Sequence, residues 1–412
     1  MERTKFTKAE ISWILYDVGN SALVLLATSV IPIYFNSLAA KDPSVESVAV
    51  GAWGAAETIA SLIIALLMPI LGSIADMEGM RKKFIVGCVG TGVVATVAMG
   101  FPTHWLAFLV IYIISSVALN GSFVFYDALL VDATTDDRMD EVSAQGFAWG
   151  YVGSCIPFIL CLLIVLNAEN FGLSMQTAML IAFVITSAWW AAFTIPLVKN
   201  VHQRSFKPRE PHALRKAISG LGGTLRDIWH NEAMRYFIIS YFFYIDGVHT
   251  VIKMSTSYGS NLGIEGTQLV LALLVTQFVA WPSSIIYGRL GKKLGTKTML
   301  LVGIVGYFCI TLFAAFFLRT AVEFWVLAIA VGLFQGGIQA LSRSQFGKLC
   351  PKDRANEYFG FFDIFGKYAA ILGTGLVSVF TFLTHNPSLG VLSISLLFVI
   401  GFLVMLKVPG GR

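Results

Sequence analysis

The chain has 412 residues, of which 56% are hydrophobic and 13% are charged, and its mean hydropathy is +0.75. A soluble globule of this composition would expose large apolar patches to water, so the composition excludes a soluble protein and indicates a lipid solvent. The net charge of +5 comes largely from basic loops between apolar segments, and therefore does not indicate nucleic-acid binding.

Apolar segments long enough to cross a bilayer as helices recur along the chain. They cover residues 13–38, 48–71, 84–101, 105–131, 143–166, 175–198, 233–258, 265–287, 298–318, 323–346, 356–383 and 387–407. They predict an all-α polytopic membrane protein with about twelve transmembrane helices in two pseudo-symmetric six-helix bundles. We expect an N-terminal bundle over 1–198, a cytoplasmic linker with an amphipathic helix over 199–232, and a C-terminal bundle over 233–412.

The first span carries polar residues within an apolar run: Tyr16, Asp17 and Asn20. Ionisable groups inside a membrane are costly and usually face a cavity or a partner. This cluster is therefore predicted to line a substrate path. The alternative is that Asp17 is a gate residue at the cytoplasmic mouth.

The loop after the second span is repeated in the second half of the chain. The stretch Gly72 to Lys83 and the stretch Gly288 to Lys297 share one skeleton at a constant offset, which maps Asp76 onto Lys292. This indicates an internal duplication. Both loops and the linker are rich in Lys and Arg, so they are predicted to face the cytoplasm together with both termini.

Asp127 in the fourth span is predicted to be a structural or gating partner.

The five cysteines have spacings that match neither a zinc site nor a redox pair, and the chain has no phosphate-binding loop. We therefore expect no metal and no cofactor.

The seventh span has the strongest candidate site. Asp246, His249, Thr250 and Lys253 fall on one helical face, and Tyr244 lies close by. The face is predicted to be a wall of the transport cavity, with Asp246 able to bind a proton or a cation. The alternative is an Asp-to-Lys pair that only holds helices together.

The tenth and eleventh spans add further polar groups. Gln335 and Gln339 lie on one stripe beside Arg343, and Asp363 and Lys367 are four residues apart. Arg343 is predicted either to form a gate salt bridge with a neighbouring acid or to extend its side chain to the membrane surface.

The sequence GSIADMEGMRKK resembles the loop after the second helix of the major facilitator superfamily. WILYDVGNSA at 13–22, YFFYIDGVHTVI at 241–252 and GGIQALSRSQFGKLCPKDRANEYFGFF at 336–362 resemble a branch that includes fungal vacuolar amino-acid effluxers. The resemblance implies a twelve-helix carrier with alternating access, in which Asp76 and Arg81 hold the cytoplasmic gate. The second loop departs from this pattern at Lys292, and the fourth span lacks the buried Arg of many proton-coupled members.

We therefore expect a secondary transporter, and not an enzyme, that moves a small polar solute such as an amino acid or a related zwitterion, with protons as the candidate coupling ion. The expected state is a monomer in a bacterial cytoplasmic membrane rather than an organellar one, with the bilayer and a small molecule as partners. A lipid or lysolipid flippase on the same fold is the alternative. A polytopic enzyme is a remote one, because only His249 of the six histidines lies inside a span.

Overall fold

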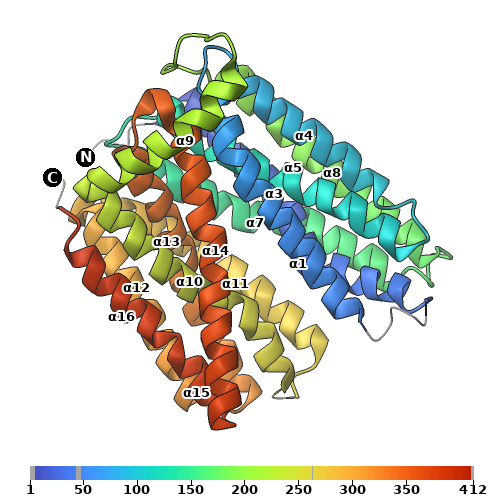
Figure 1. Ribbon diagram of the computed structural model, residues 1–412. Coiled ribbons are helices and arrows are strands. Elements are labelled where there is room, and N and C mark those ends of the chain that lie inside the picture. The colour runs from blue at the N-terminus through green and yellow to red at the C-terminus, as the bar shows by residue number, and fades with distance from the viewer. Residues whose placement is uncertain (1–4, 43–47, 262, 410–412) are drawn as a thin grey trace. The chain divides into compact units, whose positions relative to one another are not determined.

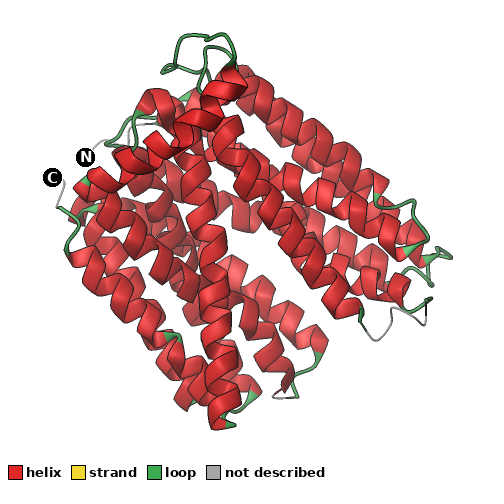
Figure 2. Ribbon diagram, viewed as in Figure 1, coloured by secondary structure: helices red, strands yellow, loops and turns green. Residues whose placement is uncertain are grey.

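The structure is a computed structural model that describes residues 5–42, 48–261 and 263–409; within these ranges it does not cover the side chains of residues 256–258, 260, 261, 267 and 367–370. Helices joined by mostly short loops make up the described chain (Figures 1 and 2). In chain order they are α1 (Lys8–Ala39), α3 (Ala49–Ala75), α4 (Arg81–Ala98), α5 (Trp105–Ala128), α6 (Leu130–Ala133), α7 (Met139–Leu166), α8 (Met175–Asn200), α9 (Ala213–His230), α10 (Glu232–Asn261), α11 (Gly266–Leu294), α12 (Thr296–Phe316), α13 (Ala321–Leu349), η1 (Lys352–Arg354), α14 (Ala355–Thr384), α15 (Pro387–Ser393) and α16 (Ser395–Leu406).

Eleven helical segments of the described chain are long and apolar enough to cross a membrane. The remaining predicted span is α4, which has 18 residues and opens on the consecutive charges Arg81, Lys82 and Lys83. These charges stand at one end of the helix, and the rest of α4 is apolar. The predicted all-α membrane fold is confirmed, and α4 occupies the place of the remaining predicted span.

Two predicted spans are interrupted in the structure. The helix of the fourth span is broken at Leu129, between α5 and α6. The last span is divided into α15 and α16 at Ile394. The second break leaves the full segment Pro387–Leu406 long enough to span, at 20 residues.

The chain forms two compact units that exchange short segments. The first unit contains residues 1–133, 149–217 and 353–360, and the second contains 134–148, 218–352 and 361–412. The first turns of α7 therefore belong to the second unit, although the rest of α7 belongs to the first. The start of α14 belongs to the first unit in the same way. The domain boundaries predicted from the sequence remain a prediction.

Each unit has its own packed interior. In the first unit α1 packs on α8 and α5 packs on both α3 and α4, and the rings of Trp13 and Tyr126 stack with centroids 4.4 Å apart. In the second unit α13 packs on α11 and α12, and α10 packs on α16. Gly337 lets the ring of Tyr287 lie against α13, because a Cβ there would be 2.2 Å from that ring.

The duplicated loops share one backbone feature. Gly79 has φ +70°, and Gly295, its counterpart in the second copy of the loop, has φ +92°. Positive φ is strained for residues with a side chain. The two loops therefore need glycine at the same position, which supports the internal duplication.

Candidate functional site

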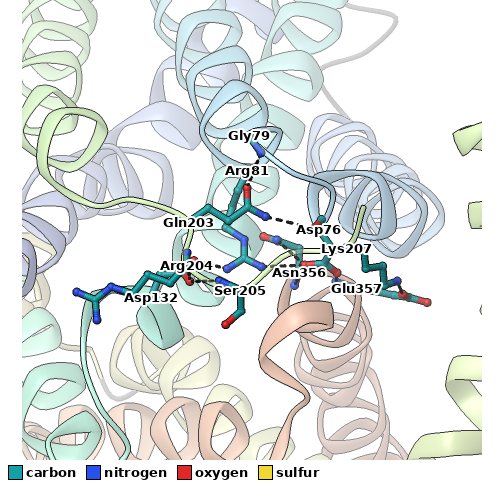
Figure 3. A network of polar contacts seen from close by, with 10 residues as sticks. All are labelled: Asp76, Gly79, Arg81, Asp132, Gln203, Arg204, Ser205, Lys207, Asn356 and Glu357. Carbon is teal, nitrogen blue, oxygen red and sulfur yellow. Dashed lines mark hydrogen bonds and ion pairs between the residues drawn. The ribbon is translucent and has the colours of Figure 1, made fainter. Parts of the chain in front are cut away.

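Five side chains form a buried network at the end of the first unit that carries the loop after α3 (Figure 3). We call them the Asp76 cluster: Asp76, Arg81, Asp132, Asn356 and Glu357. The Asp76 carboxylate accepts the backbone N–H of Asn356 at 2.9 Å and that of Glu357 at 3.0 Å. These N–H groups belong to the first turn of α14, where a helix lacks internal acceptors and carries partial positive charge. Asp76 therefore caps a helix that starts in the other half of the sequence.

Arg81 compensates the negative charge of this cluster. Its guanidinium is 0% exposed, donates to Asp76 Oδ1 at 3.0 Å and also pairs with Asp132. Burial raises the pKa of Asp76 above its usual value, while Arg81 and the N–H donors of α14 act to lower it. Removing one partner of such a buried pair leaves an uncompensated charge and typically destabilises by about 3–5 kcal/mol. The cluster therefore favours one arrangement of the loop and the start of α14.

The linker is hydrogen-bonded to the same cluster (Figure 3). Asp132 Oδ1 accepts the N–H of Arg204 at 2.8 Å. The N–H of Lys207 donates to the carbonyl oxygen of Asp76 at 2.8 Å, and Lys207 Nζ pairs with Glu357 at 2.8 Å. Residues 204–207 thus contact both the loop and the start of α14.

The second unit holds a related cluster with the charges reversed. We call it the Asp140 cluster, after its central acid: Asp140, Thr296, Ser344 and Lys348. Asp140, in the first turn of α7, accepts the Thr296 hydroxyl at 2.7 Å and pairs with Lys348 at 2.7 Å. At the offset that relates the two loops, Lys348 corresponds to Asp132 and Asp140 corresponds to Asn356. In the Asp140 cluster the acid, Asp140, lies in the first turn of a helix, and the base, Lys348, lies in the last turn of α13.

Lys292 replaces Asp76 in the second copy of the loop. Its Nζ lies 3.9 Å from the carboxylate of Glu141, the neighbour of Asp140, and both side chains are partly exposed. A lysine cannot accept N–H bonds from a helix start. The two copies therefore hold their helix starts by opposite charge patterns, as the departure at Lys292 indicated.

A glycine allows close approach in each cluster. A Cβ on Gly72 would lie 2.5 Å from the carbonyl oxygen of Asn356, and a Cβ on Gly288 would lie 3.1 Å from that of Asp140. Both contacts are with backbone atoms, which cannot turn away as a side chain can. The internal duplication therefore includes the close approach of a glycine to the backbone at the start of another helix.

Asp246 lies in the interior of the second unit and is 0% exposed. Its Oδ1 accepts the Thr250 hydroxyl at 3.2 Å and the N–H of Gly373 on α14 at 2.9 Å. Its Oδ2 is buried with no hydrogen-bond partner among the described residues. Of the predicted polar face, the structure brings Asp246 and Thr250 together, His249 is half-buried and Lys253 is exposed.

Tyr16 and Tyr244 occupy equivalent interior positions in their units, and both are 0% exposed. The Tyr16 hydroxyl donates to Ser122 on α5 at 2.8 Å, and the Tyr244 hydroxyl pairs with Ser342 on α13 at 2.6 Å. Each hydroxyl therefore already joins the first helix of its half to the fourth. Their predicted contact with substrate remains a prediction.

The other predicted substrate-binding residues are spread over both units. The Asn20 amide donates to Asp17 at 3.4 Å within α1, and both side chains are buried. Gln335 and Gln339 are half-buried on one stripe of α13. The side chain of Lys367 lies outside the described residues.

Arg343 contacts the first turns of α7 rather than lying in an exposed position. It is 4% exposed, its Nε donates to the Ser143 hydroxyl at 3.0 Å, and its guanidinium lies 4.4 Å from the centre of the Phe147 ring. This guanidinium thus reinforces the contact made by the Asp140 cluster. The other predicted gating acids, Asp127 and Asp363, are half-buried.

Sequence reasoning did not place Asp132, Asp140, Lys348 and Glu357 among the site residues. The duplication carried the necessary signal, because extending the offset of the two loops along the chain aligns Asp132 with Lys348 and Glu357 with Glu141. Across residues 5–42, 48–261 and 263–409, His, Cys, Asp and Glu side chains form no group of three or more that could hold a metal ion.

The described part of the first unit also contains cavities, of which two bear on function. The larger, about 510 Å³, is an apolar groove between α3, α4 and α5, with Lys83 at one end. The smaller, about 180 Å³, lies between α1, α3 and α5 and is lined partly by polar side chains, including Glu57.

Comparison with known proteins gives one family and one fold. The family model described as "Vacuole effluxer Atg22 like" matches residues 54–132 and 131–412. A Bacillus subtilis (strain 168) protein named "Uncharacterized MFS-type transporter YxiO" is 47% identical over 98% of this chain and 96% of its own length. "Autophagy-related protein 22" of Cryptococcus neoformans (strain JEC21) is 26% identical over 65% of this chain and 49% of its own length.

Solved structures match 96–98% of this chain at low sequence identity, and so bear on the fold alone. The human organic anion transporter MFSD10 is 12% identical with a TM-score of 0.74, covering 96% of this chain and 98% of that one. The Escherichia coli fucose:proton symporter FucP is 13% identical with a TM-score of 0.72, covering 98% of both chains.

Proposed function

Because the chain belongs to the vacuole effluxer Atg22-like family of major facilitator transporters, we propose that it exports an amino acid or a related zwitterion by alternating access. The membrane is that of a bacterial cell, with the basic loops and both termini in the cytoplasm. This orientation follows the positive-inside rule. The moving bodies are the two six-helix halves, 1–198 and 233–412, joined by the linker 199–232.

The observation that carries this proposal is the buried oxygen of Asp246 that has no hydrogen-bond partner among the described residues. An ionised carboxylate at this depth needs a proton or a cation, since burying a charge without a partner is strongly unfavourable. The ammonium group of an amino acid supplies such a cation, and a proton can replace it when the substrate leaves. Asp246 is therefore proposed to bind the ammonium group of the substrate and a proton in alternation.

The rest of the substrate would contact the remaining predicted residues. Arg343, Lys253 and Lys367 are the bases available for its carboxylate. Gln335, Gln339 and Asn20 offer hydrogen bonds from amide groups, which suit a zwitterion because they both donate and accept.

The Asp76 and Asp140 clusters are the proposed cytoplasmic gate. Each holds the start of a helix from one half of the sequence within the unit built mainly from the other half. Alternating access requires these contacts to break and re-form. Arg81 and Arg343 are the bases that stabilise the held state.

A lipid flippase on the same fold remains the second candidate. It is favoured by the apolar groove of about 510 Å³, whose lining of residues such as Leu67, Leu71 and Val117 suits an acyl chain, with Lys83 near one end for a phosphate. Asp246 has no evident role in that activity.

The test is counterflow in proteoliposomes loaded with pooled amino acids, with and without a pH gradient. We expect exchange with the purified chain, loss of exchange in Asp246→Asn, and normal exchange in Glu265→Gln, which alters an exposed acid of the second unit. Lipid scrambling without amino-acid exchange would instead favour the flippase. Exchange that persists in Asp246→Asn would exclude Asp246 from the mechanism.

A further inference from the structure

The smaller cavity of the first unit has the lining of an ion site. It lies between α1, α3 and α5 and has a volume of about 180 Å³. Its wall includes five oxygen-bearing side chains besides the hydroxyl of Ser115, which pairs with Thr96: Thr28, Glu57, Tyr112, Ser116 and Asn120. The cavity is separate from the Asp76 cluster, which shares none of these residues.

The geometry of α5 brings three of these groups to one face. Tyr112, Ser116 and Asn120 are four residues apart, so their side chains lie above one another on the helix. Glu57 reaches the same face from α3 and accepts a hydrogen bond from the Tyr112 hydroxyl. The Trp53 ring, one turn before Glu57, packs against Tyr112 in a tilted arrangement with centroids 4.4 Å apart and restricts the phenol.

Two of the other polar groups, Thr28 and Asn120, direct a hydrogen atom to the backbone. The Asn120 amide donates to the carbonyl oxygen of Ser116 at 2.8 Å, and the Thr28 hydroxyl donates to that of Val24 at 3.0 Å. Their own oxygens therefore keep lone pairs for another partner. These acceptor oxygens line the cavity beside the hydroxyls of Tyr112 and Ser116, and no lysine, arginine or histidine is among its lining residues.

Glu57 lacks a counter-charge. Among the described residues its hydrogen-bond partner is the Tyr112 hydroxyl, and no ion pair reaches it. At 1.5 Å per residue, Glu57 stands roughly 27 Å along α3 from Ala75, and so within the spanning segment. A charged carboxylate within a spanning segment is unfavourable unless a proton or a cation neutralises it.

We propose that this cavity binds a small monovalent cation, either a proton or Na⁺, with Glu57 as its charged ligand. For Na⁺ the remaining ligands are oxygens of Asn120, Ser116 and Thr28, the donor type that a hard cation prefers. For a proton, Glu57 alone is the acceptor and Tyr112 fixes the orientation of its carboxyl group.

Few other titratable groups face Glu57. On α5 the one that lines the cavity is Tyr112, and the lining residues of α1, Leu23, Val24, Ala27, Thr28 and Ile31, do not titrate. A response to pH that depends on Glu57 therefore reports this cavity. A role of the bound cation in driving transport rests on the function proposed above, but binding of the cation does not.

The test measures binding without any substrate. The purified full chain in detergent is heated in NaCl or in choline chloride at equal ionic strength, and then over pH 5.5 to 8 in choline chloride. A ligand that binds the folded state raises the unfolding midpoint, by roughly 1 °C for each 1 kcal/mol of binding free energy at this size. We expect such a rise with Na⁺ or with acidification in the wild type and in Glu169→Gln, an exposed acid of the same unit, and its loss in Glu57→Gln.

The salt comparison and the pH series together identify the cation. A higher midpoint in NaCl indicates Na⁺, and a midpoint that responds to pH alone indicates a proton. If Glu57→Gln does not fold, Asn120→Ala should weaken a sodium response several-fold and Tyr112→Phe should shift a pH response. Equal sodium and pH responses in the wild type and in the cavity variants would overturn the proposal. Failure of amino-acid counterflow would leave this result unaffected, so the two proposals are tested separately.

Discussion

The carboxylate of Asp76 accepts the backbone N–H of Asn356, a residue 280 positions later, at 2.9 Å. The acceptor lies in the loop after α3 and the donor in the first turn of α14. This bond ties the start of a helix from the second half of the sequence to the unit formed mainly by the first half. Substitutions that break this bond, or its counterpart in the second unit, should therefore have measurable effects.

Asp76→Asn should release the start of α14. The amide keeps one acceptor oxygen, but it loses the charge that pairs with Arg81 and complements the helix N-terminus. A cysteine at Ala355, which is 0% exposed, should then react several-fold faster with a maleimide in a Cys309→Ser background. Glu78→Gln alters an exposed acid of the same loop and should leave the rate unchanged. Equal rates in Asp76→Asn and the parent chain would remove Asp76 from the gate.

Lys348→Gln should destabilise the second unit. Lys348 compensates the charge of the buried Asp140. Its own side chain is 24% exposed, so solvent screens part of the interaction between the two charges. We expect a loss of about 1–3 kcal/mol, measured as a lower midpoint of thermal unfolding. Lys293→Gln changes an exposed neighbour of Lys292 and should have little effect. Adding Asp140→Asn to Lys348→Gln should restore part of the midpoint, whereas additive losses would show that the two side chains are not coupled.

Gly373→Ala should disrupt the site around Asp246. A Cβ at this position would lie 2.2 Å from the Thr250 hydroxyl oxygen and 2.6 Å from Asp246 Oδ1, so these side chains would have to move. Transport measured by counterflow should fall at least tenfold. Gly375→Ala is the matched control, because nothing lies within 4 Å of a Cβ there. Similar transport by both variants would mean that the position of Asp246 is not critical.

Tyr16→Phe and Tyr244→Phe distinguish packing from substrate binding. Tyr16→Phe removes two buried hydrogen bonds, with Ser122 and with the Trp190 indole, and Tyr244→Phe removes the one with Ser342. Each lost bond should lower stability by about 1 kcal/mol. Because these hydroxyls are already paired, we expect the KM for substrate to change less than twofold. A tenfold higher KM in a variant of normal stability would show instead that the hydroxyl reaches the substrate.

Much of the architecture follows from local patterns in the sequence. Runs of about twenty apolar residues predicted the spanning helices, and the structure agrees for segments such as α8 and α12. Helix breaks were less predictable. The break at Ile394 lies between Ser393 and Ser395 in a segment of high mean hydropathy, which carries no signal for a local change in backbone hydrogen bonding.

The candidate site could be predicted only in part. The helical spacing of Asp246 and Thr250 placed them together, because a helix fixes which residues share a face. The same reasoning could not find Gly373, which reaches Asp246 from another helix. The pairing of Tyr16 with Ser122 was missed for the same reason, since it joins residues 106 positions apart.

The sequence by itself determined the solvent, the spanning helices and the duplication, because each depends on composition, on helical period or on a repeat along one chain. The tertiary structure decided which charges meet. Asp132 and Asp140 are both acids near helix ends, yet one pairs with Arg81 and the other with Lys348. That choice depends on the packing of distant segments, where the exclusion of water makes each buried charge require a partner of opposite sign.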